Sequence, residues 1–549
     1  MTKVGDTLID SLISRGGKLF GKRSQLMSLW QHLAEHFYVE RADFTTVRNA
    51  GAELAEGLTT SYPLIVRRDL GNAFAAMLRP TEKDWFKIGT NRPDREDTES
   101  KQWLEWVGKL QKRAMYDRVA QFTRATKEGD HDFATFGQCS ISTELNASKN
   151  ALLYRCWHLR DVAWAEDHAG KVNTIYRRWK PTALELRALF PRTIHKDTLE
   201  KLKTDPYHET NVWHVVIPVE EYQDLPGAKA MRTPFVSLYI DIDHHCELEC
   251  TGSWTKIYTI PRWQTVSGSQ YAYSPAATAA LPDARLLQAV SLTLLEAGEK
   301  ATNPPMIAVQ EAIRGDVSVY AGGITWVSQE YDERLGEVLR AMAQDKTGLA
   351  FGLDTQQDLR GQLADAWFLS KLNLPPTGGP DMTAYEVGQR VQEYIRNTLP
   401  LFEPMENDYN GSLCEDTFEL ILRNSPEVAQ SVPESIRGAD IMFSFESPLH
   451  DAVEKVKIGQ FMEAQQILAT AIQLDPAAAN IVDGPKATRD VLGVTIPAAW
   501  MRSKEDADKI TAAQAEAAAA QQQLQTMQQG ADVAKTLADT GMVNPQGGM

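Results

Sequence analysis

The chain has 549 residues, of which 43% are hydrophobic and 24% charged, a balance typical of a globular protein with several cores. Its 73 Asp and Glu residues outnumber its 57 Lys and Arg residues, and the formal charge of −16 argues against a protein that coats nucleic acid. Five cysteines in so long a chain do not make a disulfide framework, and the longest apolar-rich run, residues 286–298, is too short to span a bilayer. Because the N-terminus also lacks the apolar region of a secretory signal, we expect an intracellularly made protein with reduced thiols.

The first 150 residues are predicted to be mainly helical. Residues 24–38, "SQLMSLWQHLAEHFY", carry apolar side chains at helical spacing, and residues 63–79 have the pattern of a second amphipathic helix. "PTEKDWFKIG" ends that helix and leads into a strand. Residues 99–129 are predicted to be helical again, with one apolar side formed by Trp103, Trp106, Val107, Leu110 and Met115.

The pattern changes at residues 150–260. Short β-branched or aromatic segments such as "NVWHVVIPV" and "FVSLYIDI" alternate with turn residues, which predicts a mainly antiparallel β region. The segment "TALELRALF" predicts one helix inside it.

A small β module is then predicted between two helical segments. Residues 281–300 form a helix with Pro282 at its start and with Leu287, Val290 and Leu294 on one side. The stretch "NPPMIAVQEAIRGDVSVYAGGITWVSQ", residues 303–329, is strand-like and interrupted by glycines. Helices are expected again at 331–345 and 381–424, the second with capping-box spacing between Thr383 and Glu386.

The C-terminal fifth is predicted to be helical and rich in small residues. "SPLHDAVEKVKIGQFMEAQQILATAIQLDP" has the pattern of one amphipathic helix. From residue 504 the chain is rich in Ala and Gln, and Ile510, Leu524 and Met527 belong to a heptad seam that suits close packing of many helices. The last residues, "GMVNPQGGM", are expected to be disordered.

No catalytic or cofactor-binding motif is found. "GPKAT", residues 484–488, has a Lys but lacks the spacing of a phosphate-binding loop, and no GxGxxG sequence follows a predicted strand. A GxSxG elbow is absent as well. The prediction is therefore no catalytic residue, no cofactor and no nucleotide hydrolysis.

Two clusters leave a metal-dependent hydrolase open as an alternative. In "HLAEH", His32 and His36 share a helix face and could bind zinc with Glu35 as the base, although a solvated polar face explains the same pattern. In "DIDHHCELEC", strand alternation places His244, Cys246 and Cys250 on one side and His245 on the other. That makes a four-ligand site awkward, so a β-hairpin with "DHH" at its tip is the prediction, with no metal.

The segment "PRWQTVSGSQYAYSPAATAALPDARLLQAVSLTLLEAGEKATNPPMIAV" resembles the central signature of the head-to-tail connecting (portal) proteins of short-tailed bacteriophages. Two positions depart from that signature, Ala272 where Gly is usual and Gln288 where Asn is common. "TTSYPLIVRRDLGNAFAAMLRPTEKDWFKI", "DMTAYEVGQRVQEY" and "LDPAAANIVDGPKATRDVLGV" also resemble the family, in the family's order over most of residues 25–510. The residues that carry the central resemblance are Arg262, Trp263, Tyr271 or Tyr273, Ser274, Pro275, Leu281, Pro282, Pro304 and Pro305.

The resemblance implies an α+β, portal-type fold in a ring of usually twelve subunits at one capsid vertex. Each subunit is expected to have a wing, a helical stem, a small clip that contains β-structure, and a helical crown or barrel. The implied divisions are 1–150 (N-terminal helical part of the wing), 151–278 (β-rich wing), 279–300 (descending stem helix), 301–330 (clip), 331–352 (returning stem helix), 353–445 (wing and channel helices), 446–503 (crown) and 504–549 (Ala/Gln-rich helical barrel and disordered end).

The implied function is structural. Such a ring nucleates procapsid assembly, conducts double-stranded DNA during packaging and ejection without sequence specificity, and docks first the terminase large subunit and then the head–tail adaptor or tail. Its other partners are further copies of itself and the major capsid and scaffolding proteins, without a membrane, and its place is the virion after assembly in the host cytoplasm. An acidic channel lets duplex DNA slide with little friction. Clip residues expected at turns or partner contacts are Pro304, Pro305, Gly315, Gly322 and Gly323.

Overall fold

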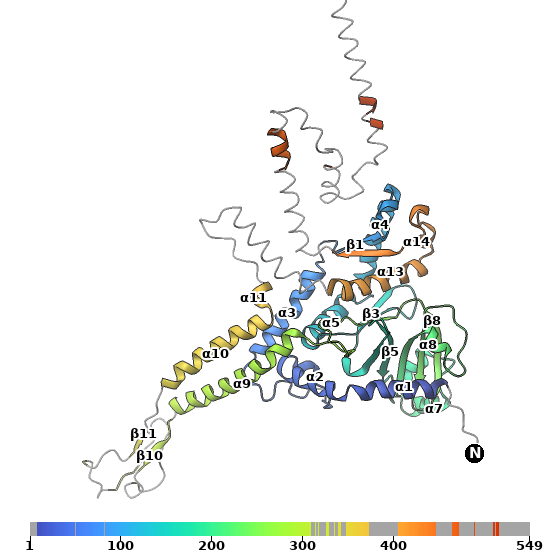
Figure 1. The fold of residues 1–549 in the computed structure, drawn as a ribbon. Coiled ribbons are helices and arrows are strands. Elements are labelled where there is room, and N and C mark those ends of the chain that lie inside the picture. Colours follow the sequence, from blue (N-terminus) through green and yellow to red (C-terminus); the bar gives the residue numbers. More distant parts are fainter. Residues whose placement is uncertain are drawn as a thin grey trace, which may run out of the picture. The chain divides into compact units, whose positions relative to one another are not determined.

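The computed structural model describes residues 8–49, 51–81, 83–302, 304–308, 347–372, 405–445 and 464–470, together with 313, 317, 326–328, 334, 339–341, 488, 509–510 and 512–514. The chain is divided into two compact units. Figure 1 labels the helices and strands that are described below. The larger comprises Met1–Lys87, Gly108–Ser431 and Phe443–Val453, and the smaller Ile88–Val107, Val432–Met442 and Glu454–Met549. Among the described residues, no helix is long and apolar enough to cross a membrane.

The N-terminal helices confirm the amphipathic patterns at 24–38 and 63–79. Trp30 and Leu33 of the first and Leu70 and Phe74 of the second are buried, as their helical spacing requires. The helix expected over 99–129 is instead two helices, because Gln121 adopts a left-handed backbone with φ of +54° immediately before the second. The helices are α1 (Leu8–Lys22), α2 (Ser24–Phe37), α3 (Tyr62–Leu78), α4 (Thr98–Met115) and α5 (Phe122–Phe136), with short 3₁₀ turns η1 (Val39–Arg41) and η2 (Pro93–Arg95).

The β region predicted at 150–260 is present and antiparallel. Five strands form a sheet in the order β4-β5-β6-β7-β8, and a second sheet has the order β3-β2-β9. The strands are β2 (Ile141–Leu145), β3 (Leu152–Cys156), β4 (Val162–Glu166), β5 (Val172–Trp179), β6 (Val212–Pro218), β7 (Phe235–Asp241), β8 (Cys246–Ser253) and β9 (Tyr258–Thr259). The predicted helix within the region is α6 (Ala183–Leu189), and α7 (Lys196–Thr204), α8 (Val219–Gln223) and η3 (Leu159–Asp161) accompany it.

Helices cover both faces of the five-stranded sheet. On one face, Leu12 and Phe20 of α1 pack with Tyr176, Trp213 and other strand residues in a buried cluster. On the other face, Leu186, Phe190 and Ile194, from α6 and the segment after it, pack on Val212 and Leu248. Alternate strand residues therefore enter two different cores, which explains why these strands are apolar on both sides.

The chain then forms a helical hairpin, α9 (Pro275–Thr302) and α10 (Thr347–Ala366), with β10 (Met306–Ala308) and β11 (Leu339–Ala341) paired antiparallel between them. The predicted helix start at Pro282 is wrong, because Ser274 Oγ accepts a hydrogen bond from the Ala277 N–H at 3.1 Å and begins the helix two turns earlier. The prediction of a helix over 331–345 is also wrong at residues 339–341. Pairing with β10 makes 339–341 a strand, and the helix that returns beside α9 lies later in the chain.

The remaining described elements follow α10. They are α11 (Leu369–Leu372), the π-helical turn η5 (Glu406–Gly411), α13 (Ser412–Asn424), α14 (Pro426–Gln430), η6 (Glu434–Ile436) and β12 (Ile441–Phe445), which pairs with β1 (Phe86–Thr90). The last part of the helix predicted over 381–424 is thus present, while Thr383 and Glu386 lie outside the described residues. Of the predicted C-terminal helices, residues 464–470, 509–510 and 512–514 are described, all as helix. Helices and antiparallel sheets in separate segments confirm the α+β class.

Replacing Asp416 by asparagine is expected to remove one source of pH dependence from the stability of the larger unit. Burial in α13 raises the pKa of Asp416 to about 6, and its Oδ2 accepts a hydrogen bond from Thr259 Oγ1 at 3.4 Å. The folded state therefore binds this proton more tightly than the unfolded chain, so stability falls as pH rises from about 4 to 6, by about 3 kcal/mol. Denaturant unfolding at several pH values should show that loss in the parent and not in the variant. Equal slopes would contradict the assignment.

Candidate functional site

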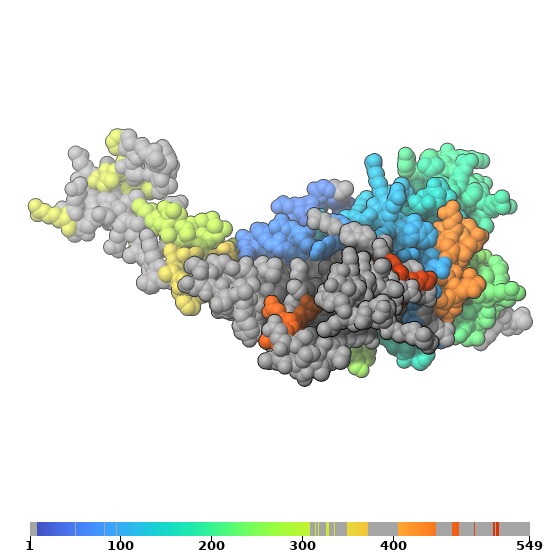
Figure 2. All heavy atoms as spheres, turned by 90° about the horizontal axis from the view of Figure 1, so that it is seen from above, coloured from blue at the N-terminus to red at the C-terminus, as the bar shows by residue number. Residues whose placement is uncertain are grey.

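The helical hairpin belongs to the larger unit and carries the small β module that the sequence predicts between two helical segments. Helices α9 and α10 lie side by side in both views (Figure 1 and Figure 2), and the ribbon shows that they run in opposite directions (Figure 1). Leu294 packs over Gly352, where a Cβ atom would come within 2.6 Å of Leu294 Cδ2. Gln356 Nε2 donates a hydrogen bond to Ser291 Oγ at 2.9 Å on the same side. The glycine thus permits close approach of the two helices, and a polar contact fixes their register.

Gln288 ties the hairpin to the segment before α3. Its Oε1 accepts hydrogen bonds from the N–H groups of Thr59 at 2.8 Å and Thr60 at 3.0 Å, and its Nε2 donates to the Thr60 carbonyl at 2.9 Å. Near the base of α10, the Tyr62 hydroxyl donates to the Arg360 carbonyl at 3.1 Å. Gln288 departs from the family signature, in which Asn is common at this position. Both the oxygen and the nitrogen of its side-chain amide take part in these hydrogen bonds.

The residues of the central sequence signature hold the start of α9 against α5. Ser274 Oγ donates a hydrogen bond to the Ala134 carbonyl at 2.6 Å, and the ring of Trp263 stacks on Phe133 with centroids 5.4 Å apart. Gly137, at the end of α5, has φ of +74°, and a Cβ atom there would overlap the backbone of Tyr273. Close packing of α5 against this turn is therefore possible only with glycine.

Tyr271, Ala272 and Arg262 complete this packing. The Tyr271 ring lies 4.5 Å from that of Trp164 and 6.0 Å from that of Trp30, and Arg262 forms an ion pair with Glu166. Ala272 is fully buried, and its N–H donates to Gln138 Oε1 at 2.9 Å. The signature is therefore a joint between the sheets of the β region and the helical hairpin.

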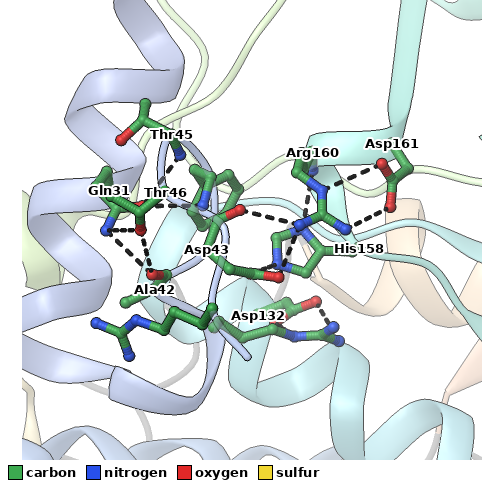
Figure 3. Close-up of polar contacts among 12 residues, drawn as sticks. Gln31, Ala42, Asp43, Thr45, Thr46, Asp132, His158, Arg160 and Asp161 are labelled. Carbon is green, nitrogen blue, oxygen red and sulfur yellow. Dashed lines mark hydrogen bonds and ion pairs between the residues drawn. The ribbon is translucent and has the colours of Figure 1, made fainter. Parts of the chain in front are cut away.

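A polar network supports this joint from the α2 side (Figure 3). Asp43 contacts His158 Nε2 at 2.6 Å and accepts a hydrogen bond from Arg160 at 2.7 Å. Burial opposes ionisation of Asp43, but the hydrogen bond from His158 and the charge of Arg160 hold its pKa below its usual value. Gln31 Oε1 accepts the N–H groups of Phe44 at 2.9 Å and Thr45 at 3.2 Å, which fixes the loop that carries Asp43.

The tip of the hairpin is described in part. Pro304 and Pro305 follow the end of α9 and precede β10, as their role as a helix stop predicts. Gly315, Gly322 and Gly323 lie outside the described residues, so the prediction of partner docking at these five positions stays a prediction. Trp326, which the sequence analysis did not single out, is 73% exposed and adjoins the bridge between Ile313 and Val327.

The structure does not assemble the zinc site that "HLAEH" left open as an alternative. His32 and Glu35 make an exposed contact of 3.5 Å, and His36 Nδ1 is bonded to the His32 carbonyl at 2.9 Å. In the described part of the chain, these residues do not form a group of three ligand atoms close to one another. The solvated polar face is therefore the better explanation of this pattern.

The "DIDHHCELEC" segment is the predicted β-hairpin, with residues 242–245 as its turn. The expectation that His244 and Cys250 share one side is wrong, because the register shifts between Tyr239 and Ile240 and reverses the facing of β8. Cys250 contacts the Tyr222 hydroxyl of α8 at 3.6 Å, while His244 stacks on His195 at the other face. The His–Cys ligand set is not brought together.

Comparison with known proteins identifies the family. The family model for the bacteriophage head to tail connecting protein matches residues 10–497. The chain belongs to this family. The resemblance predicted from the central signature is thereby confirmed.

Two curated relatives of the connector chain are named portal proteins. A probable portal protein of Bordetella phage BPP-1 is 26% identical over 460 residues, covering 80% of this chain and 79% of the relative. The portal protein of Salmonella phage epsilon15 is 20% identical over 563 residues, covering 99% and 97%. Among solved structures, the virion and the neck of a gene transfer agent particle each contain a chain that matches 79% of this one and 90% of its own length, with TM-score 0.32 and 10% and 11% identity.

Proposed function

We propose that this connector is the portal of a short-tailed bacteriophage: a ring of identical subunits at one capsid vertex, through which double-stranded DNA enters and leaves. The observation that carries the proposal is the family match over residues 10–497, supported by two relatives that are themselves named portal proteins. A structural role follows for the chain, since the family connects head to tail. Within the described residues, neither the His32–His36 group nor the His244–Cys250 group forms the site that the hydrolase alternative requires.

The helical hairpin has the surface that a ring requires. Leu287 and Leu294 of α9 face its own fold, while Leu286 and Leu295, one residue before and one after these two, project about 100° to either side. On α10, Phe351 and Leu353 flank the inward-facing Gly352 in the same way and are exposed. Apolar side chains on two flanks suit a head-to-tail contact with two neighbours, which closes into a ring. Twelve subunits is the number that we propose.

The divisions expected from the sequence fit this proposal with one change. We propose residues 1–278 as wing, α9 and α10 as the two stem helices, and the residues between them as the clip. The returning stem helix is then Thr347–Ala366, not 331–352. The formal charge of −16 suits a channel through which DNA moves without sequence-specific contacts.

We propose different partners for the clip and for the wing of such a ring. The clip would dock the terminase large subunit during packaging and the head–tail adaptor or tail afterwards. The wing would contact the major capsid and scaffolding proteins, and the mature location would be the virion after assembly in the host cytoplasm. Exposed apolar side chains at the described tip, among them Met306, Ile307 and Trp326, suit such docking.

Electron microscopy of the purified chain tests the proposal directly. Top-view class averages should show rings with a central hole and twelve-fold or nearly twelve-fold symmetry. Compact monomers or dimers over a range of salt and protein concentrations would contradict it.

Trp326→Ser is expected to reduce DNA packaging by about tenfold or more while leaving rings intact, because exposed tryptophans are frequent anchors of protein interfaces. Packaged DNA protected from nuclease measures the effect in an extract that contains the motor. Tyr207→Ser is the matched control, since Tyr207 is an equally exposed aromatic residue in the β-rich part. Normal packaging by Trp326→Ser would remove this side chain from the docking surface.

A further inference from the structure

We propose that His195, Asp197 and His244 bind one divalent transition-metal cation of the zinc class and thereby fasten α7 to the β7–β8 hairpin. The three side chains come from the start of α7 and from the hairpin turn, far apart in the sequence. Each offers one ligand atom, and these atoms all lie within 4.8 Å of one another. The site is independent of the proposed portal function.

Asp241 prepares His244 as a ligand. This carboxylate is 1% exposed, and its two oxygens accept hydrogen bonds from the His244 N–H at 3.1 Å and from His244 Nδ1 at 2.8 Å. Because the Nδ1 proton is committed to Asp241, the lone pair of His244 lies on Nε2, on the side of Asp197. A buried carboxylate that orients a histidine in this way is the usual support of a metal-bound imidazole.

The distances require only a small adjustment on binding. Asp197 Oδ2 lies 3.8 Å from His195 Nδ1 and 4.0 Å from His244 Nε2. Ligand atoms of a tetrahedral zinc site are about 3.4 Å apart, so these two pairs must each approach by about half an ångström. The carboxylate can move, since the Asp197 side chain is 65% exposed. The imidazole rings are stacked, with centroids 4.2 Å apart and planes inclined by 21°, so at least one ring must turn for both in-plane lone pairs to meet at one metal ion.

The backbone that carries the ligands is held in place. Ile194 is buried beside Phe190 and Leu248, and Thr193 Oγ1 donates a hydrogen bond to the Leu248 carbonyl of β8 at 2.5 Å. On the other side of the ligands, Thr198 of α7 is buried. The site is thus built on packed elements, and solvent reaches it at the Asp197 carboxylate and at part of the His195 ring.

The donor set selects the class of metal. Two imidazole nitrogens and one carboxylate oxygen favour zinc and its neighbours over calcium or magnesium, which prefer oxygen ligands. Two features of α7 oppose a cation: the partial positive charge of its N-terminus and the Asp197 N–H, which donates to His195 Nδ1 at 3.3 Å. The carboxylates of Asp197 and Asp241 offset the first, and the second is a long hydrogen bond that the His195 ring gives up when it turns toward the metal.

The test is calorimetric titration of ZnCl₂ into the chelator-treated full-length chain and its variants. The parent should bind one more zinc per chain than His195→Asn or Asp197→Asn, with affinity for that zinc weakened at least about tenfold in the variants. Asparagine at 195 keeps a good helix N-cap, so the variant retains its fold. His245→Asn is the matched control, because His245 pairs with Asp10 at 2.8 Å and faces away from the cluster.

Thermal melting gives a second readout. Zinc should raise the melting temperature of the parent and of His245→Asn more than that of His195→Asn. Addition of MgCl₂ at the same concentration should produce no such difference. Zinc binding and melting curves that are the same in the parent, His195→Asn and Asp197→Asn would overturn the proposal, as would a parent chain that binds no zinc.

Discussion

Replacing Asp130 by alanine is expected to lower the free energy of unfolding of the larger unit by about 3–5 kcal/mol, a large fraction of the stability of a typical domain. Asp130 of α5 and Arg79, which follows α3, form an ion pair, and both side chains are almost completely buried. Arg79 also donates to Asn410 Oδ1 at 2.8 Å and lies over the ring of Tyr409. Three segments of the chain meet at this guanidinium, so its charge would be left without its carboxylate in the core.

The direction of the pKa shift of Asp130 shows that burying this ion pair has a large desolvation cost. Burial raises the pKa of Asp130 above its ordinary value, although the charge and hydrogen bond of Arg79 act in the opposite direction. The pair therefore stabilises each partner's charge against a large desolvation cost, and its net contribution to stability is small. Removing Asp130 alone is strongly destabilising, because the charge of Arg79 stays buried without its carboxylate.

Chemical unfolding followed by circular dichroism measures this difference. The double variant Arg79→Met with Asp130→Leu should recover most of the stability that Asp130→Ala loses, because no charge remains buried. Glu128→Ala is the matched control on α5: its partner Arg124 is exposed, and the expected loss is about 0.5 kcal/mol or less. A loss of that size for Asp130→Ala would show that water reaches Arg79.

The spacing of apolar residues was sufficient to predict an element where that element buries a single face. The helix at 24–38 was predictable because Trp30, Leu33 and Phe37 recur at helical spacing and meet a single core. The β region was predictable because its strands are short, β-branched and separated by turn residues. In both cases local pattern and tertiary packing favour the same structure.

The prediction was wrong where tertiary contacts decided the structure. Residues 339–341 have a helical pattern, but pairing with β10 makes them a strand. The register shift in β8 reverses the facing of Cys250 relative to His244, and no residue type in the segment marks it. His195 and Asp197 were missed as companions of His244 because some fifty residues separate them, although the His-x-Asp spacing at a helix start is visible in the sequence.

Replacing Leu295 and Phe351 together by aspartate is expected to convert rings to folded monomers, if the stem flanks form the contact between neighbouring subunits. These side chains are 59% and 75% exposed in the single subunit, one on α9 and one on α10. Burying a Leu or Phe side chain stabilises a contact by about 1.5–3 kcal/mol each, and the contact recurs at each interface around a closed ring. A charge buried in their place adds a desolvation cost at each of these contacts.

The monomer itself should be unaffected, because neither side chain enters its core. Leu294 and Gly352, which hold α9 against α10, are unchanged in the variant. Leu184→Asp is the matched control, since Leu184 of α6 is a leucine of similar exposure on a helix of the β-rich region. Light scattering and electron microscopy should find rings for the parent and for Leu184→Asp, and monomers with parental circular dichroism for the double variant. Rings at the parental yield in the double variant would move the subunit contact away from the stem, to the wing or to the residues beyond 445.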